Sequence, residues 1–330
     1  MILEIAMAIV GLYFILKGAE WVTDAAVPLA NFFNTTHIAI GLVLVSVLLS
    51  LPELLVSLSS ILSGHADLGV GVIIGSIIVN LGLIVGITAI IKPLKIPRHV
   101  ITRDGVFMLI ATIVVTLMVL SGGVATKRDG IVFLLLLVPY LVNIYEQEKT
   151  LAKKERSRES DMIGKTLQFT GKIGGTELVI HDSRVIFLAG IAMLLVGAEL
   201  FTAGLISIAG QAGISEMLIG ITIGALGLSL PTLAAAVQAV RKGYAELAVS
   251  ETIGSNIVTL LMTLGVMAIV QPFSVDSITA GITAPALLVV TVTFFIFTMR
   301  GTISRRAGIV LVGMYVVAMV LEILARTGHL

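Results

Sequence analysis

The chain has 330 residues, of which 57% are hydrophobic and 12% are charged, and its formal net charge is +1. Its mean hydropathy is +1.11. Because soluble domains carry about 25% charged residues, this composition excludes an ordinary soluble domain and predicts a membrane protein. The absence of cysteine excludes disulfides, thiolate metal sites and cysteine nucleophiles.

Apolar runs recur along the whole chain, and a helix needs about 20 such residues to cross a bilayer. We predict ten spans, near 3–27, 38–62, 68–91, 104–121, 129–145, 185–208, 217–240, 246–270, 279–298 and 307–325. The predicted fold class is therefore an all-α, polytopic protein, which we expect to be a multi-pass protein of the plasma membrane.

Lysine and arginine are concentrated in alternate connections between the predicted spans. The basic connections lie near 92–103, 149–184, 241–242 and 300–306. The other connections and the C-terminus hold Lys127, Arg128 and Arg326. Since cytoplasmic loops carry an excess of basic residues, both termini are predicted to lie outside.

The two halves of the chain share residues at a constant offset of 179 positions. The recurring segments include GAE (18–20 and 197–199), LSLP (49–52 and 228–231) and IGS (74–76 and 253–255). We predict a five-helix repeat at 1–145, a cytoplasmic loop at 146–184 and a second five-helix repeat at 185–330. Five is an odd number, so the second repeat would be inverted. Inverted repeats are typical of secondary transporters, although channels can share the design.

A proline is the last residue of both repeated LSLP segments. Pro52 and Pro231 each lack a backbone donor, which predicts matching breaks in the second and seventh spans. Broken helix at membrane depth is tolerated where it lines a cavity or is buried in protein. Ser50 and Ser229, two residues earlier, would flank these breaks.

A carboxylate follows only the first of these prolines. Glu53 is an ionisable group at membrane depth, and such a group indicates a functional site. Its counterpart in the second half is Thr232. Carboxylate, hydroxyl and carbonyl oxygens are the ligands that suit Na⁺ or Ca²⁺.

The third and eighth spans would form the other wall of the site. Ser76 and Asn80 lie one turn apart on one helix face, and Ser255 and Thr259 are their counterparts. Glu251 lies one turn before Ser255. The second half thus has a carboxylate at 251 in place of one at 232.

Simpler interpretations exist for several of these residues. Ser76 and Ser255, taken singly, are more typical of helix packing in membranes. Glu251 is equally consistent with a position near the membrane surface. Asn256 adds a polar group, but it lies about 100° around the helix from Ser255.

No phosphate-binding glycine loop and no histidine spacing typical of a metal site are present. We therefore expect no catalytic residue, no cofactor, no use of ATP and no nucleic-acid partner. The expected partners are inorganic cations and the lipid bilayer.

Both repeats resemble those of the calcium:cation antiporter superfamily, especially the prokaryotic sodium/calcium exchangers. The patterns of that family are G-(T/S)-S-x-P-E in the second and seventh spans and G-N-x-x-G-S-N in the third and eighth. The resemblance covers the ten-span layout. It places Ser50, Glu53, Ser76 and Asn80 at ligand positions of the first repeat, and Ser229 and Ser255 match by type in the second.

Leu49 and Leu228 replace the usual threonine of the family pattern, and the second repeat departs from that pattern at three further positions. Thr232 stands in place of the second glutamate, Thr259 in place of a frequent aspartate, and Glu251 in place of an asparagine. The resemblance implies a Na⁺/Ca²⁺ exchanger that works by alternating access. The lost glutamate leaves open an exchanger coupled to H⁺ or retuned to Mg²⁺, Mn²⁺ or K⁺. A passive channel or a non-transporting ion sensor is the alternative from another class.

Overall fold

The computed structural model describes residues 1–32, 47–121, 124–155, 183–242 and 245–328. The elements before residue 156 are α1 (Ile2–Phe32), α3 (Leu51–Leu62), α4 (Ala66–Ile78), η1 (Val79–Ile84), α5 (Val85–Ile91), β1 (Leu94–Lys95), α6 (Arg98–Val100), η2 (Ile101–Gly105), α7 (Val106–Leu120), β2 (Val124–Ala125) and α8 (Lys127–Glu155).

The later elements begin at residue 183. They are α10 (Ser183–Ala212), α11 (Glu216–Ile219), η3 (Gly220–Gly224), α12 (Ala225–Lys242), α13 (Ala245–Val258), η4 (Thr259–Thr263), α14 (Leu264–Val270), β3 (Phe273–Ser274), η5 (Thr279–Thr283), α15 (Ala284–Met299), β4 (Thr302–Ile303) and α16 (Arg305–Arg326). The η elements are π-helical stretches. Most of the predicted loop 146–184 lies outside the described residues.

Eight helices within the described residues are long and apolar enough to cross a membrane. They match eight of the ten predicted spans. Of the other two, the predicted span 38–62 includes residues outside the described part and ends in the short apolar α3, and 129–145 lies within α8. The predicted all-helical membrane fold is confirmed. The count of ten and the outside position of the termini remain predictions.

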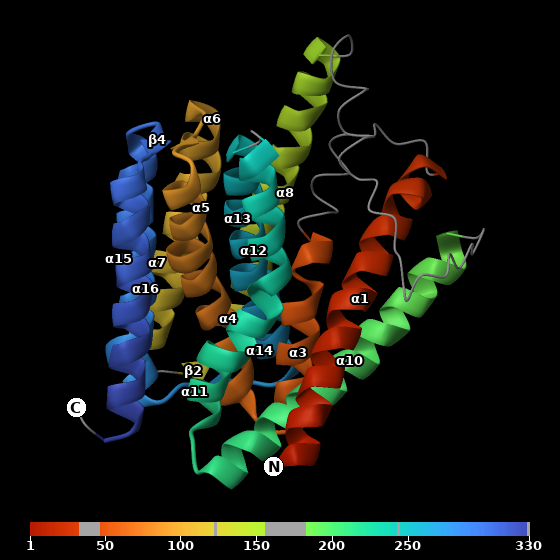
Figure 1. Cartoon of the computed structure of the whole chain (residues 1–330), viewed down its shortest axis with the longest axis vertical. Coiled ribbons are helices and arrows are strands. Elements are labelled where there is room, and N and C mark those ends of the chain that lie inside the picture. The colour runs from red at the N-terminus through yellow and green to blue at the C-terminus, as the bar shows by residue number, and fades with distance from the viewer. Residues whose placement is uncertain (33–46, 122–123, 156–182, 243–244, 329–330) are drawn as a thin grey trace.

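Element boundaries recur at the offset of 179 residues. The limits of α14 lie 179 positions after those of α5, and a π-helical stretch precedes each helix. Two short ribbons lie at opposite ends of the molecule (Figure 1). In one ribbon β1 pairs with β4, and in the other β2 pairs with β3, so each joins the two halves of the chain.

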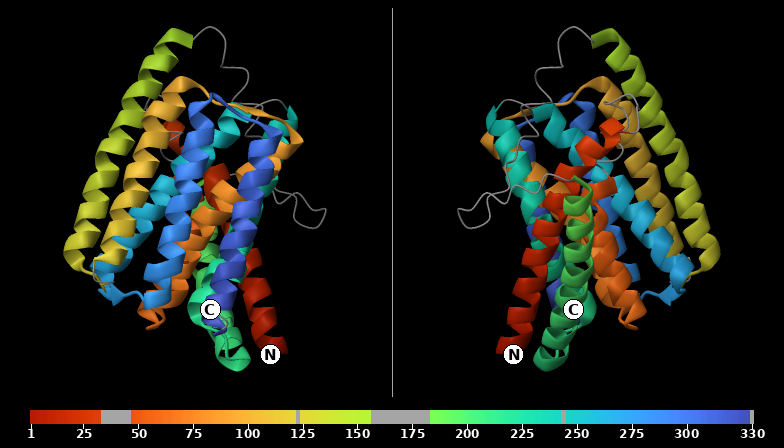
Figure 2. Two further views of the ribbon diagram at one scale, coloured as in Figure 1. Left: turned by 90° about the vertical axis from the view of Figure 1, so that its left-hand side faces the viewer. Right: turned by 90° about the vertical axis from the view of Figure 1, so that its right-hand side faces the viewer.

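The first helices of the two halves, α1 and α10, run antiparallel side by side (Figures 1 and 2). A Cβ atom added at Gly11 would lie 2.4 Å from the Phe201 backbone nitrogen, and one added at Gly204 would lie 2.7 Å from the Ala8 nitrogen. Residue numbers therefore rise along α1 as they fall along α10. Glycine permits this close approach because it has no Cβ.

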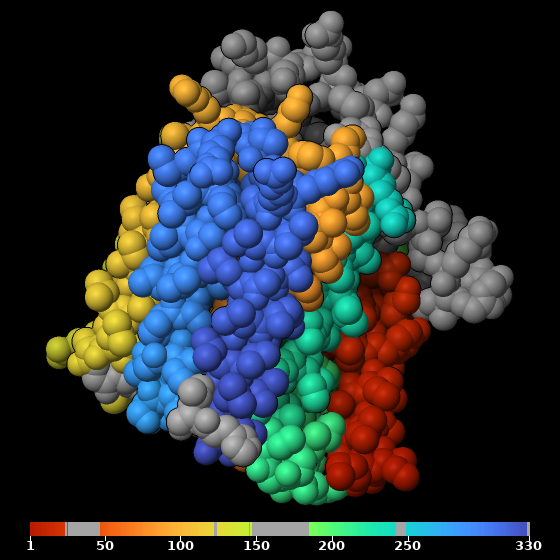
Figure 3. Space-filling view, turned by 60° about the vertical axis from the view of Figure 1, so that its left-hand side comes forward, coloured from red at the N-terminus to blue at the C-terminus, as the bar shows by residue number. Residues whose placement is uncertain are grey.

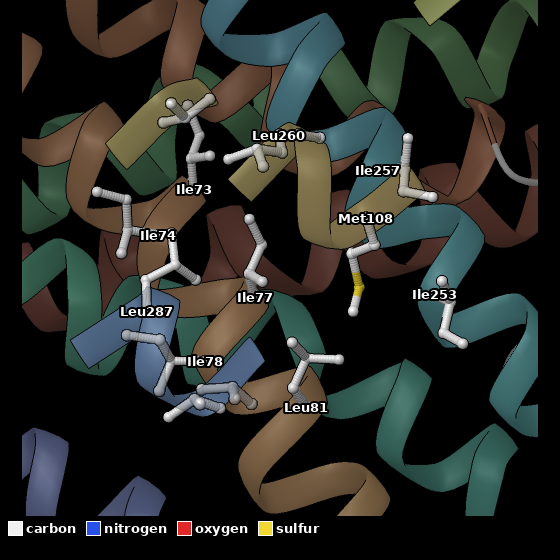
Figure 4. Close-up of a cluster of buried hydrophobic side chains, with 14 of the residues drawn as sticks. Ile73, Ile74, Ile77, Ile78, Leu81, Met108, Ile253, Ile257, Leu260 and Leu287 are labelled. Atoms are coloured by element: carbon white, nitrogen blue, oxygen red, sulfur yellow. The ribbon is translucent and has the colours of Figure 1, made fainter. Parts of the chain in front are cut away.

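The centre of the molecule is α4, which is buried from Leu68 to Ile78. Its isoleucines, including Ile73 and Ile77, face side chains such as Leu287 of α15 and Leu260 of η4 (Figure 4). A second apolar cluster is built mainly by α1 and α10. The α1–α10 pair thus packs against the other helices, which together form the larger body of the molecule.

On one face of the molecule α16 lies beside α15 (Figure 3). Ile309, Val316, Val317 and Val320 of α16 are all exposed. A face of this kind is unsuited to water and fits the hydrocarbon of a bilayer.

The predicted pair of proline breaks is half correct. Pro52 lies in the first turn of α3, just after Ser50, where a missing backbone N–H costs nothing. Pro231 instead lies inside α12, which continues as one helix from Ala225 to Lys242. A proline within a helix removes one hydrogen bond and favours a kink, but it need not end the helix.

Candidate functional site

The start of α3 places Glu53 inside the protein. Ser50 precedes the helix and Glu53 lies in its first turn, where the partial positive charge of a helix N-terminus favours a carboxylate. The Glu53 side chain is 6% exposed. Within the described part of the chain, its Oε2 atom has no hydrogen-bond partner. A buried anionic oxygen without a partner is costly, and a bound cation would offset that cost.

The junction of α4 and η1 places Ser76 and Asn80 in the interior. Both side chains are buried. Asn80 Nδ2 donates a hydrogen bond of 2.7 Å to Asn256 Oδ1. Considering the described residues alone, Ser76 Oγ and Asn80 Oδ1 are buried without hydrogen-bond partners. Both are hard oxygen atoms of the kind that coordinates Na⁺ or Ca²⁺.

The second half supplies further polar groups. Ser255 and Thr259 are buried on α13 and η4, and Ser229 is buried on α12. Ser50 Oγ donates to the Ser255 carbonyl oxygen at 3.3 Å, and the Ser255 hydroxyl donates to the Thr252 carbonyl at 3.1 Å. The Ser255 hydroxyl is therefore engaged within its own helix, whereas Ser229 Oγ has no partner among the described residues.

The three substituted positions differ in burial. Thr259 is 3% exposed, whereas Thr232 and Glu251 are partly buried. Among the residues that the structure describes, no group of three or more His, Cys, Asp or Glu side chains is placed to hold a metal ion. Any cation site here therefore depends on few carboxylates and many neutral oxygens.

Asn256 belongs with these residues, although it lies about 100° around the helix from Ser255. It is 1% exposed, and its contact with Asn80 joins α13 to the α4–η1 junction. Its angular distance from Ser255 was misleading because α13 is buried on all sides from Thr252 to Val258. The residues around Asn256, from Thr252 to Val258, are apolar or small, and this pattern could have indicated a helix that is buried on all sides.

Known proteins resemble this chain over nearly its whole length. Residues 3–145 and 183–324 match the family model described as sodium/calcium exchanger protein. The chain is 32% identical to the inner membrane protein YrbG of Escherichia coli (strain K12), over 96% of each protein. It is 28% identical to the sodium/calcium exchanger MaX1 of Methanosarcina acetivorans, over 94% of this chain and 96% of that protein.

A solved structure is also similar. The sodium-calcium exchanger NCX_Mj aligns with a TM-score of 0.64 and 25% identity, over 97% of this chain and 98% of that one. Together with the family match, this similarity agrees with the membrane fold. The chain belongs to the sodium/calcium exchanger family.

Proposed function

We propose that this protein is a secondary cation antiporter that binds its ion midway across the membrane, with Glu53 as the charged ligand. Its family makes it a membrane cation exchanger and not an enzyme, and it is a multi-pass protein of the plasma membrane. The observation that carries the proposal is the buried Glu53 carboxylate, one oxygen of which has no partner in the described structure.

The proposed neutral ligands come from four helical segments. They are Ser50, Ser76, Asn80, Ser229 and Ser255. Unpaired buried oxygens at Ser76, Asn80 and Ser229 support this assignment, within the described residues. The Ser255 hydroxyl is bonded to its own helix, so its contribution would require a small rotation. Thr232, Thr259 and Glu251 would set the choice of ion.

The proposed mechanism is alternating access. The α1–α10 pair packs closely at Gly11 and Gly204. Its apolar cluster also includes Val56 of α3 and Leu68 of α4, so the pair could slide across the other helices as the side chains at that boundary repack. Two kinds of cation that compete for one site would then move in opposite directions. The reason is that the protein would change readily between its two states only when a cation occupies the site.

The transported ions are proposed as Ca²⁺ and Na⁺, by analogy with the family. A second candidate is an exchanger coupled to H⁺ or retuned to Mg²⁺, Mn²⁺ or K⁺. Thr232 favours this candidate, because a site with one deeply buried carboxylate neutralises a divalent ion poorly. A passive channel or an ion sensor requires no counter-ion.

The test is flux into proteoliposomes for a panel of cations, under imposed Na⁺ or pH gradients. We expect saturable uptake that is accelerated by an ion on the opposite side. Ca²⁺ uptake driven by a Na⁺ gradient supports the first candidate, and uptake of another ion or dependence on a pH gradient supports the second. Uptake without trans acceleration contradicts antiport.

A further inference from the structure

We propose that two equivalent contacts, Glu199 with Ser59 and Glu20 with Gln238, form alternately and each hold the transporter in one of its two states. The inference rests on the proposed alternating access and names residues that control it. The first contact is present in this structure, and the second is its counterpart at the offset of 179 residues.

The first contact joins α10 to α3 through a hydrogen bond. Ser59 Oγ donates a hydrogen bond of 2.9 Å to Glu199 Oε2. One turn away, Thr202 Oγ1 donates to the Val56 carbonyl oxygen at 3.4 Å. Val56 is fully buried. These two bonds hold α10 against one face of α3.

The residues for the second contact are present but apart. Glu20 and Thr23 of α1 repeat Glu199 and Thr202, and the Gln238 amide of α12 can donate as the Ser59 hydroxyl does. In this structure Glu20 instead accepts a hydrogen bond of 2.6 Å from Lys17 Nζ. Gln238 is exposed.

The asymmetry extends over a whole helix face. Four residues of α12 that could pack against α1 are exposed: Pro231, Ala234, Ala235 and Gln238. Their counterparts on α3 are all buried or partly buried: Pro52, Leu55, Val56 and Ser59. One helix face is therefore covered and its equivalent is open.

Covering the two faces in turn would open opposite sides of the membrane. The halves are inverted, so α3 beyond Ser50 and α12 beyond Ser229 lead to opposite ends of the molecule. In the predicted orientation, this structure is closed outside, along α3, and open toward the cytoplasm, along α12. A shift of the closely packed α1–α10 unit toward α12 would break the first contact and form the second.

Lys17 explains why the contact with Ser59 is the one formed. It binds Glu20, whereas the equivalent position beside Glu199 is Val196, which carries no charge. The ion pair with Lys17 therefore competes with Gln238 for the Glu20 carboxylate, whereas Val196 cannot compete in this way for Glu199. Lys17 thus favours the observed state.

The absence of native cysteine allows a direct test on the full chain. Single cysteines at the equivalent positions Ala234→Cys and Leu55→Cys report water access, because maleimide reacts with a hydrated thiolate. With the contacts intact, we expect the cysteine at 234 to react faster. Ser59→Ala should slow that reaction and speed the one at 55 by about 2- to 10-fold, the range expected for one hydrogen bond.

Further variants sharpen the test. Lys17→Met should shift both rates in the same direction as Ser59→Ala, and Gln238→Ala should not. Ser63→Ala is the matched control, since Ser63 ends α3 outside the contact. The proposal is wrong if Ser59→Ala and Ser63→Ala change the labelling rates equally. It is also wrong if Ser59→Ala raises the labelling rate of both reporter cysteines, because that result indicates a general loosening of the helix packing. Flux into proteoliposomes, measured on the same variants, distinguishes failure of this proposal from failure of the proposed function. Absence of antiport refutes the proposed function, whereas antiport with unchanged labelling rates refutes the two contacts.

Discussion

At the residue scale, the unequal pair Glu53 and Thr232 dominates the site. A carboxylate buried at 6% exposure can neutralise one positive charge, and its counterpart offers only a hydroxyl. Glu251 is the other carboxylate close in sequence to the proposed ligands, one turn before Ser255. Two arrangements of the proposed site are therefore possible. In one, Glu53 is the single carboxylate, and in the other Glu251 replaces the missing second glutamate.

Thr232→Glu tests the first arrangement. We expect it to strengthen Na⁺-driven Ca²⁺ exchange, because it adds a second negative charge to the proposed site. The measurement is the Ca²⁺ concentration that gives half-maximal uptake in proteoliposomes. If Thr232→Glu changes nothing while Glu251→Gln abolishes transport, the second charge has moved to α13.

Asn256→Ala tests the contact between the two halves. Loss of the Asn256 oxygen leaves Asn80 Nδ2 buried without its acceptor, which should cost about 1–3 kcal/mol of stability. Thermal unfolding in detergent measures the loss. Thr88→Val is the control, since the hydrogen bonds that the structure describes for the Thr88 hydroxyl go to the carbonyls of Ile84 and Val85, in the turn just before it. Equal effects of the two substitutions would contradict the role of Asn256.

Sequence predicts the residues of this site unevenly. The burial of Glu53 could be predicted because its carboxylate lies beside a proline, deep in an apolar run, and such a group indicates a functional site. Asn256 could not, because helical periodicity assigns polar residues to one face, and α13 has no exposed face from Thr252 to Val258. The hydrogen bond from the Ser255 hydroxyl to its own helix could not be predicted either, since a serine hydroxyl can bond to its own helix or face a ligand.

At the element scale, the repeated motifs predicted which segments are equivalent but not their local form. LSLP recurs in both halves, yet Pro52 begins a helix and Pro231 lies within one. The motif fixes where one hydrogen bond is missing. Packing of the neighbouring turns decides whether the helix ends there, and sequence alone does not reveal that packing.

Glycine contacts determine how closely the elements approach. A Cβ atom added at Gly220 of η3 would lie 2.4 Å from the Leu68 carbonyl oxygen of the central α4. Gly220→Ala should therefore push these helices apart and cost about 1–3 kcal/mol of stability. Thermal unfolding of the purified protein is the measurement.

Gly313→Ala is the matched control for Gly220→Ala. Nothing lies within 4 Å of a Cβ atom added at Gly313 on α16. Alanine also has a higher helix propensity than glycine, so this variant should be neutral or up to about 1 kcal/mol more stable. A Gly220→Ala protein as stable as Gly313→Ala would contradict the close crossing of α4 and η3.

At the scale of the whole molecule, charged side chains form a network where α16 ends, with Arg326 and Glu322 buried and Asp276 exposed. Arg326 of α16 contacts the Glu322 carboxylate, binds Asp276 at 2.6 Å and donates to Thr279 at 2.9 Å. Glu322 also accepts a bond of 2.8 Å from Thr283. Arg326 thus joins the last helix to η5 and to the segment before it.

Arg326→Met should destabilise the protein strongly. It leaves Glu322, which is 1% exposed, as an unpaired buried charge, and such a loss costs about 3–5 kcal/mol. Thermal unfolding measures it against Arg306→Met, which removes an exposed arginine from the other end of α16. Similar stability of the two variants would refute the structural role of the network.

The composition and the repeats allowed the membrane fold and the family to be predicted from sequence, because both depend on patterns that extend over hundreds of residues. The conformational state could not be predicted. Glu20 and Glu199 are the same residue type in equivalent positions, so the choice between their contacts depends on small free-energy differences such as the Lys17 ion pair.

The most direct test of the account is uptake of Ca²⁺ by proteoliposomes under an imposed Na⁺ gradient, compared between the wild-type chain and Glu53→Ala. We predict gradient-driven uptake in the wild type and background uptake in Glu53→Ala. Glu216→Ala should retain uptake, because it removes an acid that pairs with His65 near the end of the molecule. Uptake that persists unchanged in Glu53→Ala would contradict the proposed site.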